Sequence, residues 1–397
     1  LAAPNAHWVK SVDSAGDAGR LAAEAWVASF GPQPGPVSLV LPADSAWQQG
    51  GAHGPHLERP ALRRIGADVI DEAVTAVRAA SNPALLINGT ALGEAGLAAA
   101  ARLQAAGINI LTDTFVPRQA RGAGRFMPDR LQYFAEMALA QLDGCDLLLL
   151  AGTRAPVAFF AYPDKPGSLV PEGCKTLSLG GSDSDSAAAL EMLADAMGAV
   201  ESAPVAQLEM PDLPTGELNP GAIGASIARH LPEHAIVADD GVTGSLATFL
   251  PTAGARPHDW MMLTGGAIGM GLPLALGAAI AAPDRKVLCL SGDGAGMYTN
   301  QALWSMAREK ADIVTVVFVN HSYRILNIEL YRTGAGNPGP VADAMLNLGG
   351  PEIDWVKLSE AQGVPGELAT TAADFEAALV RGFEQDGPYL IAALVPG

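Results

Sequence analysis

The 397-residue chain has only three cysteines, Cys145, Cys174 and Cys289, and they stand far apart in the sequence. Cysteines so few and so scattered exclude a disulfide framework and a cysteine-based zinc site. The chain also lacks an uncharged apolar run of about 18 residues, so no membrane-spanning segment is expected. Positive charge is scarce, because 24 Lys and Arg face 42 Asp and Glu and give a net charge of −18. Such a charge repels nucleic acid and anionic membranes, and we expect neither as a partner.

The first five residues, Leu1–Asn5, contain neither a methionine nor a basic stretch, so they do not form a secretory signal. Hydrophobic residues make up 49% of the chain, which is enough for the cores of two or three domains. We therefore expect a cytoplasmic enzyme of the α/β class.

Two apolar strands that each end in polar residues are the most informative feature of the sequence. Lys286–Leu290 and Ile313–Val319 have the composition of buried strands, and apolar residues at helical spacing between them predict a helix over Tyr298–Lys310. A strand, a helix and a second strand joined by short turns form a βαβ unit, whose strands are parallel. Asp293 follows the first strand and Asn320 the second, so both should lie at the carboxyl edge where open α/β sheets bind ligands.

A carboxylate and an amide oxygen at one sheet edge suit a hard cation such as Mg²⁺. Gly292, Gly294 and Gly296 surround the aspartate, and we expect them to let backbone N–H groups approach a phosphate at the helix N-terminus. A plain glycine turn is the alternative, because the chain has 45 glycines and a lone Gly-Asp-Gly is a weak signal.

The spacing between the aspartate and the asparagine is 320 − 293 = 27 positions. This pattern of Gly-Asp-Gly followed by asparagine resembles the thiamine-diphosphate (ThDP) motif. The resemblance implies that Mg²⁺ is held by the Asp293 carboxylate, the Asn320 side chain and the backbone carbonyl of Ser322. The chain departs from the family in one place, because Val319 stands where the family usually has a first asparagine.

The chain divides into three segments. Residues 1–48 contain one predicted helix, Ala18–Phe30, and one predicted strand, Val37–Leu41, on either side of a Gly/Pro turn at 31–36. One helix and one strand cannot bury a core by themselves. Residues 49–58 have the composition of a linker.

Residues 59–200 alternate predicted helices and strands, which indicates a small Rossmann-like domain. The predicted elements are helices at Ile70–Ala80 and Gly93–Ala106 and strands at Ala84–Asn88, Ile108–Thr112 and Asp146–Ala151. The acidic, small-residue stretch Gly180–Pro204 and the Pro-rich stretch Met210–Pro220 indicate a junction. Residues 205–397 hold the metal motif, with further strands predicted at Ile236–Asp239 and Tyr389–Leu394 and a buried glycine-rich helix at Gly265–Ala282.

The order of these segments resembles the ThDP-dependent 2-oxo acid enzymes over the whole chain, and most of all their acetolactate synthase and benzoylformate decarboxylase branch. The likeness is carried by Gly152–Val157, Gly265–Pro273, and Gly292–Gly294 together with Ala302–Trp304. The resemblance implies an α/β fold of doubly wound parallel-sheet domains. Residues 1–48 would be the C-terminal remnant of a pyrimidine-binding domain, 59–200 a central Rossmann-like domain, and 205–397 the diphosphate- and Mg²⁺-binding domain.

The resemblance also implies cofactor contacts. Ile268 would be an apolar wedge that bends the cofactor and brings its 4′-imino nitrogen near the reactive C2–H. The alternative for Ile268 is an ordinary core residue. The Gly266 carbonyl would accept from the 4′-amino group, and the Gly241–Ser245 turn would bind diphosphate. The expected cofactor contacts are Gly241, Thr243, Gly266, Ile268, Gly292, Asp293, Gly294, Ala295, Asn320, Ser322, Tyr323 and Ile325.

Residues after the metal asparagine should face the substrate, and His321 and Leu326 are the candidates. Pyruvate decarboxylases have a glutamate where Leu326 stands, so its apolar side chain argues against simple aldehyde release by that route. The alternatives are a helix core position for Leu326 and a solvated loop imidazole for His321.

Two further groups of residues leave alternatives open. Asp239 and Asp240 end a strand, and they either face the ligand or cap the helix that begins near Thr243. In the middle segment, Arg118, Arg121, Arg125 and Arg130 either meet the phosphates of FAD, as acetolactate synthases bind FAD there, or form a solvated and salt-bridged loop. Gly89–Gly93 does not match the dinucleotide fingerprint, so NAD is not expected, and Trp304 and Met306 are predicted core residues.

ThDP enzymes of this family use a catalytic glutamate from the pyrimidine-binding domain, usually supplied by a partner subunit. Glu24 is in the wrong place for that role, and the matching residue is expected upstream of Leu1. The chain is therefore expected to be a fragment of a longer protein or a shortened one.

The resemblance implies ThDP- and Mg²⁺-dependent decarboxylation and carboligation of a 2-oxo acid such as pyruvate, of the acetolactate synthase type. The alternatives are a benzoylformate decarboxylase-like enzyme and a non-catalytic ThDP-binding homologue. A homodimer or homotetramer is expected, because the family closes its active site between chains.

Overall fold

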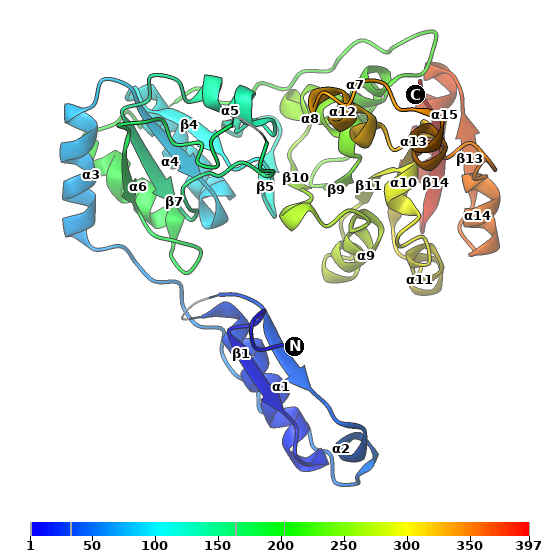
Figure 1. The fold of residues 1–397 in the computed structure, drawn as a ribbon, viewed down its shortest axis with the longest axis horizontal. Helices are drawn as coiled ribbons and strands as arrows, with labels where there is room; N and C mark the ends of the chain where they lie inside the picture. Colours follow the sequence, from blue (N-terminus) through cyan, green and yellow to red (C-terminus); the bar gives the residue numbers. More distant parts are fainter. Residues whose placement is uncertain (1, 32–33, 163–164, 202, 397) are drawn as a thin grey trace.

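The computed structural model describes residues 2–31, 34–162, 165–201 and 203–396, which form three β-sheets (Figure 1). A two-stranded sheet near the N-terminus lies apart from two larger sheets, which stand side by side. The predicted α/β class with parallel sheets flanked by helices is confirmed. Among the described residues, no helix is both long and apolar enough to cross a membrane.

The N-terminal unit consists of β1 (Trp8–Ser11), α1 (Ala15–Phe30), β2 (Val37–Val40) and α2 (Ala43–Trp47). β1 and β2 pair in parallel, so the expectation of a single strand in this segment was wrong. The missed strand is short and largely polar or exposed, and it has no clear alternation. The Gly/Pro turn predicted at 31–36 includes residues 32 and 33, which lie outside the described part. Residues 49–58, the predicted linker, contain no helix or strand.

The five-stranded sheet has the order β6-β4-β3-β7-β8, and all its strand pairs are parallel. Its helices and strands are α3 (Ala67–Ala79), β3 (Pro83–Ile87), the 3₁₀ turn η1 (Gly89–Leu92), α4 (Glu94–Ala105), β4 (Asn109–Thr112), β6 (Asp129–Arg130), α5 (Ala135–Gln141), β7 (Leu147–Ala151), β8 (Lys175–Ser178) and α6 (Ser186–Met197). α6 falls within Gly180–Pro204, which was wrongly predicted to be part of a junction. Asp185 caps this helix by accepting a hydrogen bond from the N–H of Ala188 at 3.1 Å.

The seven-stranded sheet has the order β13-β14-β12-β11-β9-β10-β5. Its strands are β5 (Gln119–Arg121), β9 (Ile236–Asp240), β10 (His258–Met261), β11 (Val287–Gly292), β12 (Ile313–Val319), β13 (Gly366–Ala369) and β14 (Tyr389–Leu394). Six of them are parallel, and β5 pairs antiparallel with β10. β5 belongs to the 59–200 segment in sequence, so that segment contributes the edge strand of the seven-stranded sheet.

Helices cover both faces of the seven-stranded sheet. They are α7 (Pro220–His230), α8 (Ser245–Phe249), α9 (Gly271–Ala281), α10 (Asp293–Gly296), α11 (Ala302–Glu309), α12 (Arg324–Arg332), α13 (Pro340–Leu346), α14 (Trp355–Ala361) and α15 (Ala372–Glu384), with 3₁₀ turns η2 (Val242–Gly244), η3 (Pro251–Gly254) and η4 (Thr264–Gly266). Along β11, Leu288 and Leu290 join the core formed with α7 and α15, whereas Val287 and Cys289 join the core formed with α9 and α11. This alternation produces the doubly wound arrangement.

Two predictions in this part of the chain were wrong. The glycine-rich helix predicted from Gly265 begins only at Gly271, because Gly265, Gly266 and Gly269 have positive φ angles that a right-handed helix does not allow. Trp304 is 54% exposed and lies under the guanidinium of Arg308, so it is not a core residue, whereas Met306 is fully buried as predicted.

Candidate functional site at the carboxyl edge of the seven-stranded sheet

Asp293 and Asn320 lie at neighbouring strand ends, because β11 and β12 pair in parallel with Gly292 opposite Phe318. The Oδ2 atom of Asp293 accepts hydrogen bonds from the N–H groups of Asn320 at 3.1 Å and His321 at 2.7 Å. Its Oδ1 atom accepts from the N–H of Gly294 at 2.8 Å. The two ends of the sequence motif are thus brought together by direct hydrogen bonds across the sheet edge.

The carboxylate of Asp293 is buried, with only 3% of the residue exposed. Burial raises the pKa of Asp293, while the N–H groups of His321, Gly294 and Asn320 act in the opposite direction. Backbone donors therefore surround this carboxylate, and no side-chain donor competes for it in the described residues. A carboxylate held in this way is a suitable ligand for a hard cation.

The loop after β12 is held in an unusual conformation. His321 has a φ of 54°, in the left-handed region that non-glycine residues rarely adopt. The Asn320 side chain accepts from the N–H of Ser322 at 3.0 Å, and the Asn327 amide donates to the Ser322 hydroxyl at 3.0 Å. These contacts place the side chain of Asn320 and the backbone of Ser322 in one tight turn next to Asp293.

No group of three or more His, Cys, Asp or Glu side chains is arranged to hold a metal ion in the part of the chain that the structure describes. The predicted Mg²⁺ site is of a different kind, since only Asp293 belongs to those residue types. Its other ligands would be an amide side chain and a backbone carbonyl, both of which are oxygen donors that Mg²⁺ accepts.

The glycines around Asp293 have different roles. A Cβ atom on Gly294 would lie 2.6 Å from the ring of Tyr323, and one on Gly296 would lie 2.6 Å from the ring of Trp355. Close packing therefore requires both glycines. Gly292 is less restricted, since the only atom near its Cβ position is 3.9 Å away.

Asp239 and Asp240 at the end of β9 are both buried and support two separate loops. Asp239 accepts from the N–H of Gly241 at 3.0 Å, from the Ser245 hydroxyl at 2.7 Å and from the Trp260 indole at 3.1 Å. Burial raises its pKa. Neither aspartate caps η2 or α8, so the helix-cap alternative was wrong. Asp239 instead shapes the Gly241–Ser245 turn, which was predicted to bind diphosphate.

Asp240 anchors the glycine loop that precedes α9. Its Oδ2 atom accepts from the N–H of Gly269 at 2.8 Å and of Gly271 at 3.2 Å. The Thr299 hydroxyl donates to the Gly269 carbonyl at 2.6 Å and holds the loop from the other side. The sequence motif did not identify these anchors, because they lie about 30 positions from the loop they fix.

The anchored loop presents Gly265–Ile268 at the surface of the chain. Gly265 and Gly266 have φ angles of 65° and 66°, and no atom lies within 4 Å of their Cβ positions. Ile268 is 44% exposed, which excludes the alternative that it is an ordinary core residue. The Gly266 carbonyl accepts from the N–H of Ile268 at 2.9 Å.

The candidate cofactor and substrate residues beyond Asn320 lie on the same edge. Tyr323 packs over Gly294, and its N–H donates to the Leu346 carbonyl at 2.9 Å. Ile325 is half-buried and Leu326 is 47% exposed at the start of α12, so Leu326 is not a helix core residue. Thr243 lies in η2, and Ala295 is buried in α10.

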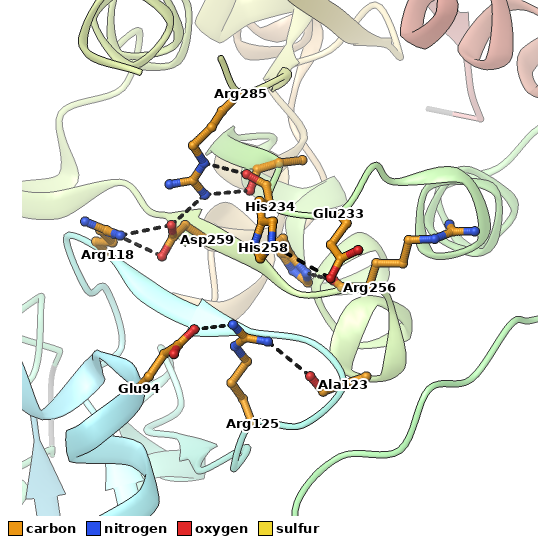
Figure 2. Close-up of polar contacts among 11 residues, drawn as sticks. Glu94, Arg118, Ala123, Arg125, Glu233, His234, Arg256, His258, Asp259 and Arg285 are labelled. Carbon is orange, nitrogen blue, oxygen red and sulfur yellow. Dashed lines mark hydrogen bonds and ion pairs between the residues drawn. The ribbon is translucent and has the colours of Figure 1, made fainter. Parts of the chain in front are cut away.

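The four arginines of the middle segment do not form one cluster. Arg118 donates two hydrogen bonds of 3.0 Å to Asp259, and Arg125 pairs with Glu94 (Figure 2). Arg121 is fully buried, stacks 3.4 Å over the Phe249 ring and donates to the Phe249 carbonyl at 2.6 Å. Burial and the nearby Arg130 lower the pKa of Arg121. The salt-bridged alternative thus describes Arg118 and Arg125, whereas Arg121 and Arg130 are packed inside.

A cavity of about 840 Å³ lies between the two larger sheets. It is bordered by the turns at Gly89 and Gly152, which follow β3 and β7, and by Arg118, Arg125 and His258. Figure 2 shows Arg285 reaching the same carboxylate as Arg118, with a 2.7 Å hydrogen bond to Asp259. Three arginines at this cavity, Arg118, Arg125 and Arg285, are therefore already paired with carboxylates of the chain.

Glu24 lies on α1 in the N-terminal unit, and Figure 1 shows α1 apart from α10, the helix that begins at Asp293. It accepts from Lys10 at 2.8 Å and from Arg20 at 2.6 Å. Both contacts lower its pKa, so it is an ordinary ion-paired surface carboxylate.

Comparison with known proteins identifies relatives of this site. The family model "Thiamine pyrophosphate enzyme, C-terminal TPP binding domain" matches residues 241–393. A Mycobacterium tuberculosis (strain ATCC 25618 / H37Rv) protein named "Putative acetolactate synthase large subunit IlvX" is 45% identical over 393 residues, covering 98% of this chain and 75% of that protein. The benzoylformate decarboxylase of Pseudomonas aeruginosa is 29% identical over 266 residues, covering 63% of this chain and 48% of the enzyme.

Comparison with solved structures likewise finds a ThDP-dependent enzyme. The solved structure of the ThDP-dependent 4-hydroxybenzoylformate decarboxylase of Rhodococcus jostii RHA1 superposes with a TM-score of 0.80 at 25% identity. The match covers 98% of this chain and 76% of that one.

The doubly wound sheets and the polar edge at Asp293 define a cofactor-binding enzyme of the α/β class. The chain belongs to the family of ThDP-dependent 2-oxo acid enzymes, and the ThDP-binding domain lies in its C-terminal part. The predicted family is thereby confirmed.

Proposed function

We propose that the chain binds ThDP through Mg²⁺ at the edge around Asp293 and acts on a 2-oxo acid such as pyruvate, in the manner of an acetolactate synthase. The observation that carries the proposal is the buried Asp293 carboxylate, which accepts hydrogen bonds from the loop of Asn320 as well as from Gly294. This arrangement holds oxygen-bearing residues from two neighbouring strand ends at one sheet edge, where they would suit a hard cation such as Mg²⁺.

In this proposal, Asp293, the Asn320 side chain and the Ser322 carbonyl hold Mg²⁺. The turn at Gly241 and Thr243 and the N–H groups of Gly292 and Ala295 would face the diphosphate, beside Gly294, whose N–H donates to Asp293. The turn is rigid, because Cβ positions on Gly241 and Gly244 lie only 3.2 and 3.1 Å from the Phe318 ring. Backbone N–H groups in such a fixed turn suit a phosphate group.

The glycine loop has a separate role. It leaves Gly266 and the Ile268 side chain exposed at the surface of the chain, where the proposal places the pyrimidine end of the cofactor. ThDP, when bound, supplies the electron sink for the loss of CO₂ from a 2-oxo acid. Tyr323 and Ile325 would border the cofactor, and His321 and Leu326 the substrate. The apolar Ile325 and Leu326 would exclude water from the reacting carbons.

The choice of reaction is supported by the relatives. The acetolactate synthase assignment follows the name of the mycobacterial relative. The apolar Leu326 fits the acetolactate synthase and benzoylformate decarboxylase branch, because the glutamate of pyruvate decarboxylases is absent there. A benzoylformate decarboxylase-like activity is the alternative, because two relatives carry such names. A non-catalytic ThDP-binding homologue is the third possibility, in which Asp293, Asn320 and Ile268 bind the cofactor without turnover.

Several further assignments belong to the same proposal. Residues 1–48 are assigned to a pyrimidine-binding domain, 59–200 to the central domain and 205–397 to the diphosphate domain. A homodimer or homotetramer in the cytoplasm is proposed, with the catalytic glutamate outside these 397 residues. The cavity between the larger sheets is the only observation in favour of FAD binding. Arg118 and Arg125 do not add to it, because they are paired with Asp259 and Glu94.

The test is ThDP binding by calorimetry, with Mg²⁺ and with excess chelator, followed by product analysis with pyruvate and with benzoylformate. Binding should require Mg²⁺ and should be abolished in Asp293→Ala. Binding that survives this substitution would place the metal elsewhere. Formation of acetolactate, of benzaldehyde or of no product would distinguish the three candidate functions. Flavin absorbance of the purified protein tests FAD, and light scattering tests the assembly.

A further inference from the structure

α12 carries Ile325 and Leu326, yet its own burial does little to hold it. All nine of its residues are described, and none of them is buried in the single chain. Isolated helices shorter than about 12 residues are marginal in water. Six of its nine residues are half-buried, and the helix packs on η2 and α13, so the contacts at its two ends add to a weak packing surface.

The N-terminal end of α12 is fixed to the loop at the candidate metal site. The His321 carbonyl accepts from the N–H of Leu348 at 2.7 Å, and the N–H of Tyr323 donates to the Leu346 carbonyl at 2.9 Å. Together with the contacts of Asn320 and Asp293, these bonds define where the helix starts. They leave its direction to the other end.

The C-terminal end of α12 is held by the 59–200 segment. Arg332, in the last turn, donates to both carboxylate oxygens of Glu136, at 2.5 and 3.0 Å. The same guanidinium lies 3.7 Å over the ring of Phe134 and 5.8 Å from the ring of Tyr162. A two-pronged contact of this kind fixes orientation as well as distance, which a lysine could not do.

A second contact runs parallel to the first. The Tyr162 hydroxyl donates to Oε2 of Glu329 at 2.8 Å, one turn before Arg332. Oε1 of Glu329 lies 4.0 Å from Nε of Arg332. Two neighbouring side chains of α12 thus engage two separate positions of the middle segment. We call Glu136, Tyr162, Glu329 and Arg332 the α12 latch.

The charges of the latch suit the helices that carry them. Glu136 lies in the first turn of α5, where the helix dipole favours a negative charge, and Arg332 lies in the last turn of α12, where it favours a positive one. Hydrogen bonds from Arg332 lower the pKa of Glu136, and those to Glu136 raise the pKa of Arg332. The side chain of Arg332 is only 21% exposed, so water screens this pair less than an open surface pair.

We propose that the α12 latch is a positioning device for the substrate side of the site, in which the middle segment sets the direction of α12 and thereby the location of Ile325 and Leu326. Arg332 and Glu136 are positioning residues, because they touch neither Asp293 nor the glycine loop. The proposal rests on the ThDP site proposed above. It gives the middle segment a part in substrate binding that does not require any ligand of its own.

The test uses Glu136→Gln and Arg332→Gln, with Arg381→Gln as the matched control. Arg381 also makes two hydrogen bonds to one carboxylate, that of Glu367, at 3.1 and 2.6 Å. Glu367 lies on β13, the edge strand of the seven-stranded sheet opposite β5. Backbone hydrogen–deuterium exchange over 324–333 is measured first. We expect faster exchange there in both latch variants, unchanged exchange over α9 and α11, and no change with the control.

Substrate kinetics provide the second readout. We expect the KM for the 2-oxo acid to rise about tenfold in the latch variants with a smaller change in kcat, because misdirected Ile325 and Leu326 weaken binding first. Arg332→Lys, which keeps the charge without the two-pronged contact, should fall between wild type and Arg332→Gln. Tyr162→Phe should have a smaller effect in the same direction, and it retains the ring beside Arg332.

Unchanged exchange over 324–333 in both latch variants would overturn the proposal, as would an equal effect of Arg381→Gln. Failure of the wild type to bind ThDP would instead overturn the proposed function. In that case the exchange measurement still decides whether the latch holds α12. If Arg332→Gln does not fold, Tyr162→Phe and Glu136→Gln give the same decision.

Discussion

The two larger sheets carry an aspartate at the same kind of position, and the partners of that aspartate differ. Asp113 follows β4 in the five-stranded sheet, and its Oδ2 atom accepts from the Asn88 amide and the Thr153 hydroxyl, both at 2.6 Å. Those donors follow the neighbouring strands β3 and β7. Asp293 follows β11 in the seven-stranded sheet and accepts from backbone N–H groups.

The two aspartates differ in whether side chains or backbone groups donate hydrogen bonds to them. Around Asp113, the polar side chains that follow three strands hydrogen-bond to one another, and these bonds stabilise the sheet edge. Around Asp293, the backbone supplies the hydrogen bonds, so the Asn320 side chain stays outside the carboxylate's network. Polar residues after parallel strands therefore do not identify a ligand site by themselves, and the two edges of this chain differ in the type of hydrogen-bond donor that surrounds the aspartate.

The largest test of this comparison replaces each aspartate with its amide. Asp293→Asn should weaken Mg²⁺-dependent ThDP binding by about 100-fold or more, because the amide removes the charge that a hard cation needs. Asp113→Asn should leave binding unchanged and lower stability by about 1 kcal/mol through its weaker hydrogen bonds. Calorimetric titration and urea unfolding measure the two effects. Equal losses of binding would remove the distinction between the edges.

A second test uses glycines with positive φ at the two edges. A Cβ on Gly152, whose φ is 71°, would lie 2.4 Å from the Asn88 carbonyl, whereas Gly266 at 66° has no atom within 4 Å. Gly152→Ala should lower the free energy of unfolding by about 3 kcal/mol, from backbone strain plus overpacking. Gly266→Ala should cost about 1 kcal/mol, from strain alone. ThDP affinity should fall only in the second variant, as measured by titration.

The smallest test concerns the pKa of Asp240. Burial raises this pKa to about 6, against the hydrogen bonds from Gly271 and Gly269. Because the folded-state pKa exceeds the unfolded value, the unfolded state loses its proton first. Stability contributed by the protonated carboxyl is therefore present at low pH and is lost as pH rises toward and through 6. Between pH 5 and pH 8, the free energy of unfolding of wild type should therefore fall by about 1 kcal/mol more than that of Asp240→Asn.

The measurement is the difference in urea unfolding between wild type and Asp240→Asn at those two pH values. The variant should gain relative to wild type as the pH rises. A constant difference would mean that Asp240 is already ionised at pH 5 in the folded protein.

Much of the fold could be predicted from local sequence. The apolar runs that form β12 and β14 are continuous, so their bounds agree with prediction to the residue. β8 and β5 were missed, because Lys175–Ser178 and Gln119–Arg121 are short and polar and gain strand structure only from their neighbours. α6 was missed because its alanines and acidic residues resemble those of a linker.

The candidate site divides in the same way. Asp293 and Asn320 were predicted because each follows a recognisable strand and their spacing is fixed by the βαβ unit. Asp240 was a candidate, but its role as an anchor of the glycine loop was not predicted, and Thr299 was missed, since their hydrogen bonds to Gly269 depend on how three elements pack. The pair of Arg332 and Glu136 joins residues 196 positions apart, and no local pattern indicates such a contact.

The edge strand β5, which comes from the 59–200 segment, limits how far the two larger sheets can be separated. Removing everything before residue 205 would strip β5 from β10 and take away Arg121, leaving the backbone groups of β10 as an open edge beside the aromatic rings of Phe249 and Trp260. Open edges of this kind pair with other chains and promote aggregation. The ThDP-binding part is therefore not an independent module, and any recombination between relatives would have to carry residues 119–121 together with the sheet that they complete.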